Sequence, residues 1–230
     1  MAAAITVPVL AIDGPSGSGK GTLAQLLAKK LGWHLLDSGA LYRIVGLAAV
    51  DQGVDFDDEA GLVGVAEHMD VKFKAAEHGE PTAVLLNGAD ISNAVRSEQS
   101  GYYASRVAVF QGVRQALHDR QRDFAKAPGL VADGRDMGTE VFPDAALKIF
   151  LTASAESRAE RRYKQLMNKG ESVNLAALLM DIQARDQRDR ERAVAPLRPA
   201  TDAVVIDSTA MDIDQVFQQV LTLLQQRGLI

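Results

Sequence analysis

The stretch Gly14-Pro15-Ser16-Gly17-Ser18-Gly19-Lys20-Gly21-Thr22 decides the fold of this chain, because it predicts a glycine-rich loop that binds phosphate groups. The apolar run Val7–Ile12 precedes it and an amphipathic helical pattern, Thr22–Leu31, follows it, which is the strand, loop and helix order of such loops. Glycines let backbone N–H groups turn toward an anion, and the following helix adds the positive end of its dipole. We expect Lys20 to lie against the β- and γ-phosphates of a nucleotide.

The loop departs from the common phosphate-loop pattern G-x-x-x-x-G-K-[ST] at one position. Gly21 stands where the metal-binding hydroxyl normally follows the lysine, and Thr22 comes one residue later. This form resembles the loop of nucleoside monophosphate kinases more than that of GTPases or motor ATPases. A glycine-rich turn without a ligand is the alternative, but it leaves the conformational cost of four glycines unexplained.

Short apolar runs alternate with helical patterns along the chain, which predicts an α/β fold with a parallel five-stranded sheet flanked by helices. Ligands bind at the carboxyl ends of the strands in such sheets, and polar residues follow several of these runs, as at Asp37-Ser38 and Asp133–Asp136. The candidate strands are Val7–Ile12, His34–Leu36, Leu130–Ala132, Ala146–Leu151 and Ala203–Ile206.

One region breaks this alternation. Val71–Ala75 alternates apolar and polar residues, Glu77–Pro81 predicts a turn, and Ala83–Leu86 leads into Asn87-Gly88. These patterns predict small antiparallel strands in an inserted subdomain that spans residues 64–104. Elsewhere, the helical stretches Leu175–Ile182 and Val216–Leu224 carry apolar residues at helical spacing, and we expect both to face the core.

Composition excludes several classes of function. The formal net charge of −5 argues against a general nucleic-acid or membrane-surface role, which needs a broad basic surface. The chain has no cysteine, so disulfides and thiolate chemistry are excluded. No apolar run approaches the roughly 18 residues of a membrane span, and the four histidines show no metal-binding spacing. We expect a monomer in the cytoplasm.

Four segments together resemble a known family, the bacterial cytidylate kinases, over nearly the whole chain. They are the loop Gly14–Thr22 and the segments Leu36–Arg43 (LDSGALYR), Ala132–Thr139 (ADGRDMGT) and Arg185–Arg192 (RDQRDRER). The resemblance implies transfer of the γ-phosphoryl group of ATP to CMP and dCMP, giving CDP or dCDP and ADP, with Mg²⁺ bridging the donor phosphates. It also implies a P-loop core domain of residues 1–63, 105–155 and 172–230, the inserted monophosphate-binding subdomain at 64–104 and a short lid at 156–171.

By the same resemblance, a group of polar residues holds the acceptor nucleotide. Guanidinium groups suit a tetrahedral phosphate, and a carboxylate with cationic and hydroxyl donors suits the N4 donor and the N3 and O2 acceptors of cytosine. The residues implied for the monophosphate are Ser38, Arg43, Arg135 and Arg185; those for the base are Ser105, Arg114 and Asp136; those that surround the ribose or line the cleft are Tyr42, Asp189 and Arg192.

Three arginines of one predicted helix, Arg158, Arg161 and Arg162, lie on one side of it because their spacing is i, i+3, i+4. In kinases of this class a lid closes over ATP and excludes water, and we take Arg158 and Arg162 as its arginines. The predicted catalytic residues are therefore Lys20, Arg135, Arg158, Arg162 and Arg185. A charged solvent face, balanced by glutamates of the same helix, is the alternative for the lid arginines.

The sequence assigns no protein ligand to the metal. With Gly21 at the usual hydroxyl position, we expect phosphates and water to hold Mg²⁺, with Thr22 as a candidate ligand. Asp133 ends an apolar run as a Walker B aspartate does, but a structural role in the following turn explains it equally well.

Two other functions remain open. One is a phosphotransferase for UMP or a small alcohol such as a shikimate-like acid. The other is a nucleotide switch or motor ATPase, against which two sequence features argue: Asn168-Lys169-Gly170-Glu171 lacks the final aspartate of a GTPase N-K-x-D motif, and Gly134 rather than a glutamate follows Asp133.

Overall fold

The computed structural model describes residues 7–74, 83–168 and 170–230. Contacts between residues divide the chain into two compact units, one of Met1–Asp37 and Gln121–Ile230 and the other of Ser38–Arg120. Within the described ranges, no helix is both long enough and apolar enough to cross a membrane.

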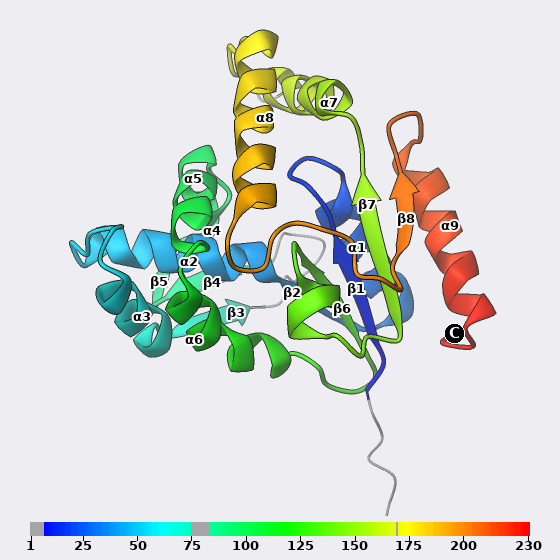
Figure 1. Cartoon of the computed structure of the whole chain (residues 1–230), viewed down its shortest axis with the longest axis horizontal. Helices are drawn as coiled ribbons and strands as arrows, with labels where there is room; N and C mark the ends of the chain where they lie inside the picture. Colours follow the sequence, from blue (N-terminus) through cyan, green and yellow to red (C-terminus); the bar gives the residue numbers. More distant parts are fainter. Residues whose placement is uncertain (1–6, 75–82, 169) are drawn as a thin grey trace, which may run out of the picture. The chain divides into compact units, whose positions relative to one another are not determined.

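A five-stranded sheet forms the centre of the first unit (Figure 1), with the order β2-β6-β1-β7-β8 and parallel pairing throughout. The inner strands β1 and β6 are buried along their whole length, as apolar strands of a parallel sheet are. The predicted α/β class and parallel sheet are confirmed. Each strand lies within two residues of its predicted bounds: β1 (Val9–Asp13), β2 (His34–Asp37), β6 (Leu130–Gly134), β7 (Leu147–Thr152) and β8 (Val204–Asp207).

Helices α1 (Lys20–Leu31) and α9 (Ile213–Gln226) pack against this sheet and form its main hydrophobic core. α9 contributes the buried side chains Val216, Val220 and Leu224, so the core-facing role predicted for Val216–Leu224 is confirmed. A capping box fixes the start of α9, because Asp212 and Gln215 each accept the backbone N–H of the other.

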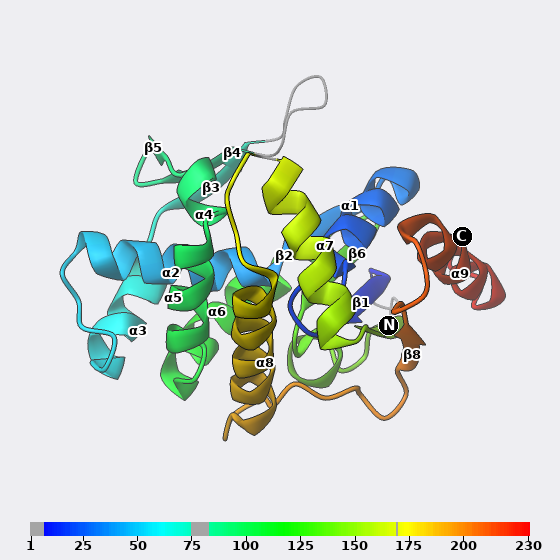
Figure 2. The same ribbon diagram turned by 90° about the horizontal axis from the view of Figure 1, so that it is seen from above.

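Helices α7 (Ala155–Asn168) and α8 (Leu175–Glu191) pack against each other (Figure 2). The core-facing role predicted for Leu175–Ile182 is wrong, because no residue of this stretch is buried and Met180 is 69% exposed. The apolar residues of Leu175–Ile182 do have helical spacing. Among the described residues, however, α7 is the main element packed against α8, and this single helix does not bury the apolar side of Leu175–Ile182. The buried residues of α8, Asp186 and Asp189, lie in its second half.

The second unit contains a three-stranded antiparallel sheet of β3 (Val71–Lys74), β4 (Ala83–Leu86) and β5 (Ala89–Asp90). The predicted antiparallel strands are thus confirmed, and Asn87 and Gly88 have the positive φ values of a tight hairpin turn. The predicted turn Glu77–Pro81 lies outside the described residues. The helices here are α2 (Ser38–Asp51), α3 (Glu59–His68), α4 (Ser92–Val95), α5 (Glu98–Val107) and α6 (Gln111–Arg122), which ends two residues beyond the unit.

The compact unit Ser38–Arg120 includes the predicted insertion at 64–104 and extends beyond it on both sides. The bounds given above for the core domain, the insertion and the lid stay predictions. Lys169, which falls inside the predicted lid, is not among the described residues.

Candidate active site

The predicted phosphate loop connects β1 to α1, and its glycines have steric reasons to be there. Gly14 has a φ of 153°, and a Cβ atom at this position would lie 2.0 Å from the carbonyl oxygen of Leu151. Gly19 has a φ of 93° and directly precedes the first residue of α1. Because other side chains rarely adopt these φ values and no Cβ fits at Gly14, glycine is required for this path of the chain.

Lys20, the first residue of α1, turns its side chain back toward the phosphate loop. Its side chain is buried, its Nζ donates a hydrogen bond to the Pro15 carbonyl oxygen at 3.1 Å, and its Nζ lies 4.0 Å from Oδ1 of Asp133. Burial lowers the pKa of Lys20, the charge of Arg135 lowers it further, and Asp133 opposes the shift. An anion that binds in this loop would therefore stabilise the charged form of the Lys20 ammonium group.

Asp133 lies at the end of β6, close to the unusual position of the loop. Burial raises the pKa of its carboxyl group, and the charge of Lys20 opposes this shift. A Cβ atom on Gly21 would lie 3.2 Å from Oδ2 of Asp133, a tighter approach than side chains normally make. The glycine that replaces the usual hydroxyl residue thus leaves room for a buried carboxyl group next to the lysine.

A second group of predicted residues gathers around Asp189 on α8. Arg135 donates from Nε to Oδ2 of Asp189 at 3.0 Å. Burial alone would raise the pKa of Asp189, but the charges of Arg135, Arg192 and Arg185 outweigh it and hold that pKa below its usual range. Arg135 and Arg185 also lower the pKa of Lys20. Arg135 and Arg185 therefore act electrostatically on both Asp189 and Lys20 of the phosphate loop.

Arg158 on α7 is the most deeply buried of the predicted lid arginines, at 2% exposure. Its guanidinium forms a forked pair with the Asp186 carboxylate, with Nη1 at 3.0 Å from Oδ1 and Nη2 donating to Oδ2. It also donates from Nη1 to the Ser16 carbonyl oxygen at 2.9 Å and from Nε to the Ala153 carbonyl oxygen at 3.0 Å. The solvent-face alternative is wrong for Arg158, which instead joins α8, the phosphate loop and the end of β7.

The other two arginines of α7 have different surroundings. Arg161 donates to the Ser208 carbonyl oxygen after β8. Arg162 is partly exposed and donates to Gln165 at 3.3 Å; burial lowers its pKa and the charge of Glu171 opposes that shift. Of the two arginines predicted for the lid, Arg162 is thus the one with access to solvent.

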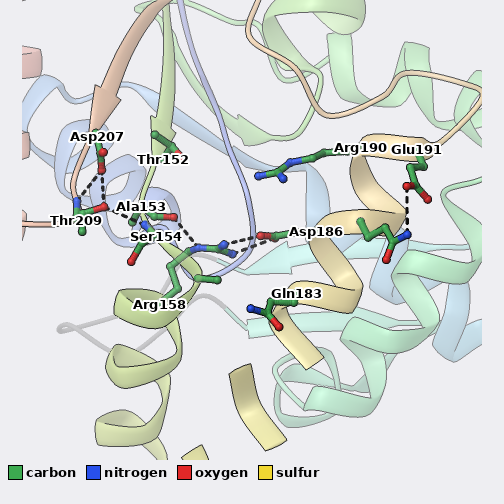
Figure 3. A pocket seen from close by; sticks show the side chains of 12 residues that line it. Thr152, Ala153, Ser154, Arg158, Gln183, Asp186, Arg190, Glu191, Asp207 and Thr209 are labelled. Atoms are coloured by element: carbon green, nitrogen blue, oxygen red, sulfur yellow. Dashed lines mark hydrogen bonds and ion pairs between the residues drawn. The ribbon is translucent and has the colours of Figure 1, made fainter. Parts of the chain in front are cut away.

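A cavity of about 540 Å³ lies beside the Arg158–Asp186 pair, between the ends of β7 and β8 and the second half of α8 (Figure 3). Figure 3 shows the two charged groups facing each other, with Asp207 and Thr209 on one side of them and Arg190 on the other. The polar residues of its lining include Thr152, Ser154, Arg190, Glu191, Asp207 and Thr209.

The second unit holds the remaining predicted nucleotide ligands, which are Ser38, Tyr42, Arg43, Ser105 and Arg114. Ser38 is buried, and Ser105 donates to the Tyr102 carbonyl oxygen at 2.8 Å. Nη1 of Arg43 lies 3.0 Å from each of three oxygens, on Val95, Ser97 and Ser100. The guanidinium of Arg114 lies 5.7 Å from the centre of the Tyr42 ring, a cation–π contact that orients both side chains.

Two carboxyl groups in this region were not predicted as site residues. Asp186 is the partner of Arg158, and Asp13 accepts the backbone N–H groups of Met137 and Gly138 at 2.8 Å each. A sequence signal existed for Asp13, since it is an acidic residue at the end of a fully apolar strand and next to the phosphate loop. Asp136, predicted to read the base, is 3% exposed and immediately precedes these two N–H groups.

Comparison with known proteins finds relatives of this chain by sequence and by structure. A family model described as cytidylate kinase matches residues 10–226. Cytidylate kinase of Pseudomonas entomophila is 59% identical over 223 residues, covering 97% of this chain and 98% of that protein, and cytidylate kinase of Aeromonas hydrophila is 59% identical over 220 residues, covering 96% and 95%. A solved shikimate kinase from Bacteroides thetaiotaomicron is 16% identical, covers 95% and 98%, and has a TM-score of 0.47. From the family match and these two relatives, the chain belongs to the cytidylate kinase family.

Proposed function

We propose that this chain transfers the γ-phosphoryl group of ATP to CMP and dCMP, giving CDP or dCDP and ADP. The observation that carries the proposal is the placement of Lys20, at the end of a glycine-shaped loop, in the same electrostatic neighbourhood as Arg135 and Arg185. Phosphoryl transfer asks a protein mainly for positioning and for neutralisation of negative charge. A cluster of cations around a phosphate loop meets both requirements.

On the donor side, the backbone N–H groups of Gly14–Thr22 and the Lys20 ammonium bind the β- and γ-phosphates. Arg158 supports this loop through its hydrogen bond to the Ser16 carbonyl oxygen. The cavity beside Arg158 accommodates the nucleoside of the donor, and its hydroxyl, carboxylate and guanidinium groups offer hydrogen bonds to ribose and base. Arg162, which has access to solvent, acts as the lid arginine.

On the acceptor side, the family resemblance assigns the monophosphate to Arg135, Arg185, Ser38 and Arg43. An oxygen of this phosphate attacks the γ-phosphorus, and the bond from that phosphorus to the oxygen bridging it to the β-phosphate breaks, so that ADP leaves. The cations neutralise the charge shared by the attacking and leaving oxygens.

The base is read by hydrogen bonds of defined direction. A carboxylate at Asp136 accepts from the N4 amino group of cytosine, whereas uracil sets its O4 acceptor against it. Ser105 and Arg114 donate to the O2 and N3 acceptors, and Tyr42, Asp189 and Arg192 border the ribose. The preference for CMP therefore arises largely from repulsion of the wrong base.

Mg²⁺ accompanies ATP in this proposal, and the donor set fits it. The Asp133 carboxyl group and the Thr22 hydroxyl are oxygen donors near the loop, and Mg²⁺ prefers oxygen and retains several waters. The ion supplies charge neutralisation at the donor phosphates. Among the described residues no three acidic or histidine side chains are grouped so that they could hold a metal ion. A monomeric state and a cytoplasmic location stay predictions.

The test is ADP formation from ATP and Mg²⁺, with CMP, dCMP, UMP, AMP and GMP offered separately beside a control without acceptor. High rates with CMP and dCMP and low rates with the others are expected. Equal rates with CMP and UMP would retain the kinase and reject the base-reading argument. Hydrolysis that does not depend on an acceptor would reject the kinase.

A further inference from the structure

Asp13 is buried where β1 ends and the phosphate loop begins. It is the last residue of the strand and is 4% exposed. Its Oδ1 accepts the backbone N–H of Met137 and its Oδ2 accepts that of Gly138, each at 2.8 Å. Because the two oxygens belong to one planar carboxyl group, these hydrogen bonds fix both the orientation of the Met137–Gly138 backbone and its distance from Asp13.

Asp13 is joined to both ends of the two-residue loop Arg135-Asp136. On one side, Asp13 and Gly134 are partners in the parallel register of β1 and β6. On the other side, the Asp13 side chain holds Met137 and Gly138, the first residues of η1 (Met137–Val141). The residues between these attachments are the two that the proposed function places against the monophosphate and the base.

A carboxyl group in this position costs free energy, which argues against simple packing as its role. Burial raises the pKa of Asp13 to about 7; the two backbone hydrogen bonds oppose this shift, and the charges of Asp136 and Asp133 add to it. An apolar side chain would fill the space without that cost, but it would leave two buried N–H groups without an acceptor. The carboxyl group is therefore suited to holding this backbone.

The surrounding packing leaves the loop little freedom. A Cβ atom on Gly138 would lie 3.1 Å from Cδ of Lys148 and 3.4 Å from Oδ2 of Asp13, and one on Gly134 would lie 2.8 Å from Cγ of Met137. Both glycines thus allow the close approach on which the Asp13 hydrogen bonds depend.

We propose that Asp13 is a positioning residue for the acceptor nucleotide: it holds the Arg135-Asp136 loop in the orientation that the monophosphate and the base require. It also connects this orientation to the phosphate loop, which starts at the next residue. The inference rests on the function proposed above. Asp13 acts through the backbone of Met137 and Gly138 and touches neither substrate.

The first test is Asp13→Asn, which keeps the shape of the side chain and one acceptor oxygen but replaces the other with an amino group. The KM for CMP is expected to rise about tenfold or more, because misplacement of substrate-binding groups is costly even when small. The preference for CMP over UMP should shrink with it, while the KM for ATP stays within about twofold, since the glycines that shape the phosphate loop are unchanged. Asp212→Asn is the matched control, because Asp212 also accepts a backbone N–H, from Gln215 in the same unit, and it should leave all three quantities at wild-type values.

A second variant, Gly138→Ala, keeps the carboxyl group and places a Cβ atom 3.1 Å from Cδ of Lys148 and 3.4 Å from Oδ2 of Asp13, so that the backbone held by Asp13 or the Lys148 side chain must shift. It should give the same pattern of changes as Asp13→Asn, and it decides the matter if Asp13→Asn does not fold. A purely structural role would lower stability and leave the KM for CMP and the base preference unchanged, so wild-type values in a folded variant would overturn the inference. Failure of the wild-type protein to phosphorylate CMP would instead reject the proposed function.

Discussion

The Arg158 guanidinium and the Asp186 carboxylate form a forked ion pair in which the side chains are 2% and 8% exposed. The pair joins α7 to α8, and Arg158 also holds the Ser16 carbonyl oxygen of the phosphate loop. α8 also carries Arg185 and Asp189, on either side of Asp186. The Arg158–Asp186 pair therefore connects the phosphate loop to the helix that carries these two site residues.

Asp186→Asn should destabilise the protein strongly, because removal of one partner leaves the Arg158 charge buried without its counterion. A loss of about 3–5 kcal/mol in the free energy of unfolding is expected, measured by urea denaturation. Asp57→Asn is the control, since Asp57 pairs with Arg106 but is 84% exposed, and it should cost at most about 1 kcal/mol. A loss for Asp186→Asn as small as that of the control would contradict the role assigned to this pair.

Lys20→Ala should reduce turnover by about 10²–10³, as expected when one donor to the charge of a transition state is removed. The measurement is the steady-state rate of ADP formation with CMP on a variant whose folding is confirmed by circular dichroism. Lys29→Ala, on the exposed side of the same helix, should keep wild-type turnover. Near-normal turnover of folded Lys20→Ala would remove the phosphate loop from the mechanism.

Asp136→Asn should reduce the ratio of kcat/KM for CMP to that for UMP. The amide no longer repels the O4 atom of uracil, and each correctly paired base contact is worth about 1–3 kcal/mol of discrimination. The control is Asp144→Asn. Asp144 is an exposed aspartate between η1 and β7, and its replacement should not change the ratio. An unchanged ratio in Asp136→Asn would mean that other residues read the base.

The pH dependence of the free energy of unfolding should reveal the raised pKa of Asp13. Its pKa is raised from 3.8 to about 7 in the folded protein, so the folded state keeps a proton that the unfolded state releases. Its contribution to stability is therefore fully present below about pH 4 and is lost as the pH rises to about 7, at no more than about 1.4 kcal/mol per pH unit. Urea denaturation at several pH values should show that the stability of the wild type relative to Asp13→Asn falls over this range and is level above it. A relative stability that rises with pH would contradict the raised pKa of this carboxyl group.

The fold could be predicted from the sequence because its signals are local. A fully buried parallel strand is a short apolar run, and Gly14–Thr22 marks the turn that follows the first one, so the strand bounds were within two residues of those observed. The stretch Leu175–Ile182 shows the limit of this reasoning. Its apolar spacing indicates an amphipathic helix, but the number of partners that cover the helix is set by tertiary packing.

The sequence predicts the site as a set of residue types, and it contains no signal for the pairings that the structure shows among them. A cluster of three arginines in the sequence predicts a role for Arg158, yet its surroundings depend on Asp186, which lies 28 residues away, and on the Ser16 carbonyl oxygen. Asp13 contacts Met137 and Gly138 across 124 and 125 residues. Such contacts follow from strand order, which no local pattern contains.

The central claim is that the γ-phosphoryl group of ATP passes to CMP. The most direct measurement follows radiolabelled γ-phosphate from ATP in the presence of Mg²⁺ and CMP, with CDP and inorganic phosphate separated by chromatography. The account predicts that the label appears in CDP, that little inorganic phosphate forms, and that omission of CMP stops the reaction. Label that appears as inorganic phosphate at the same rate with and without CMP would contradict it.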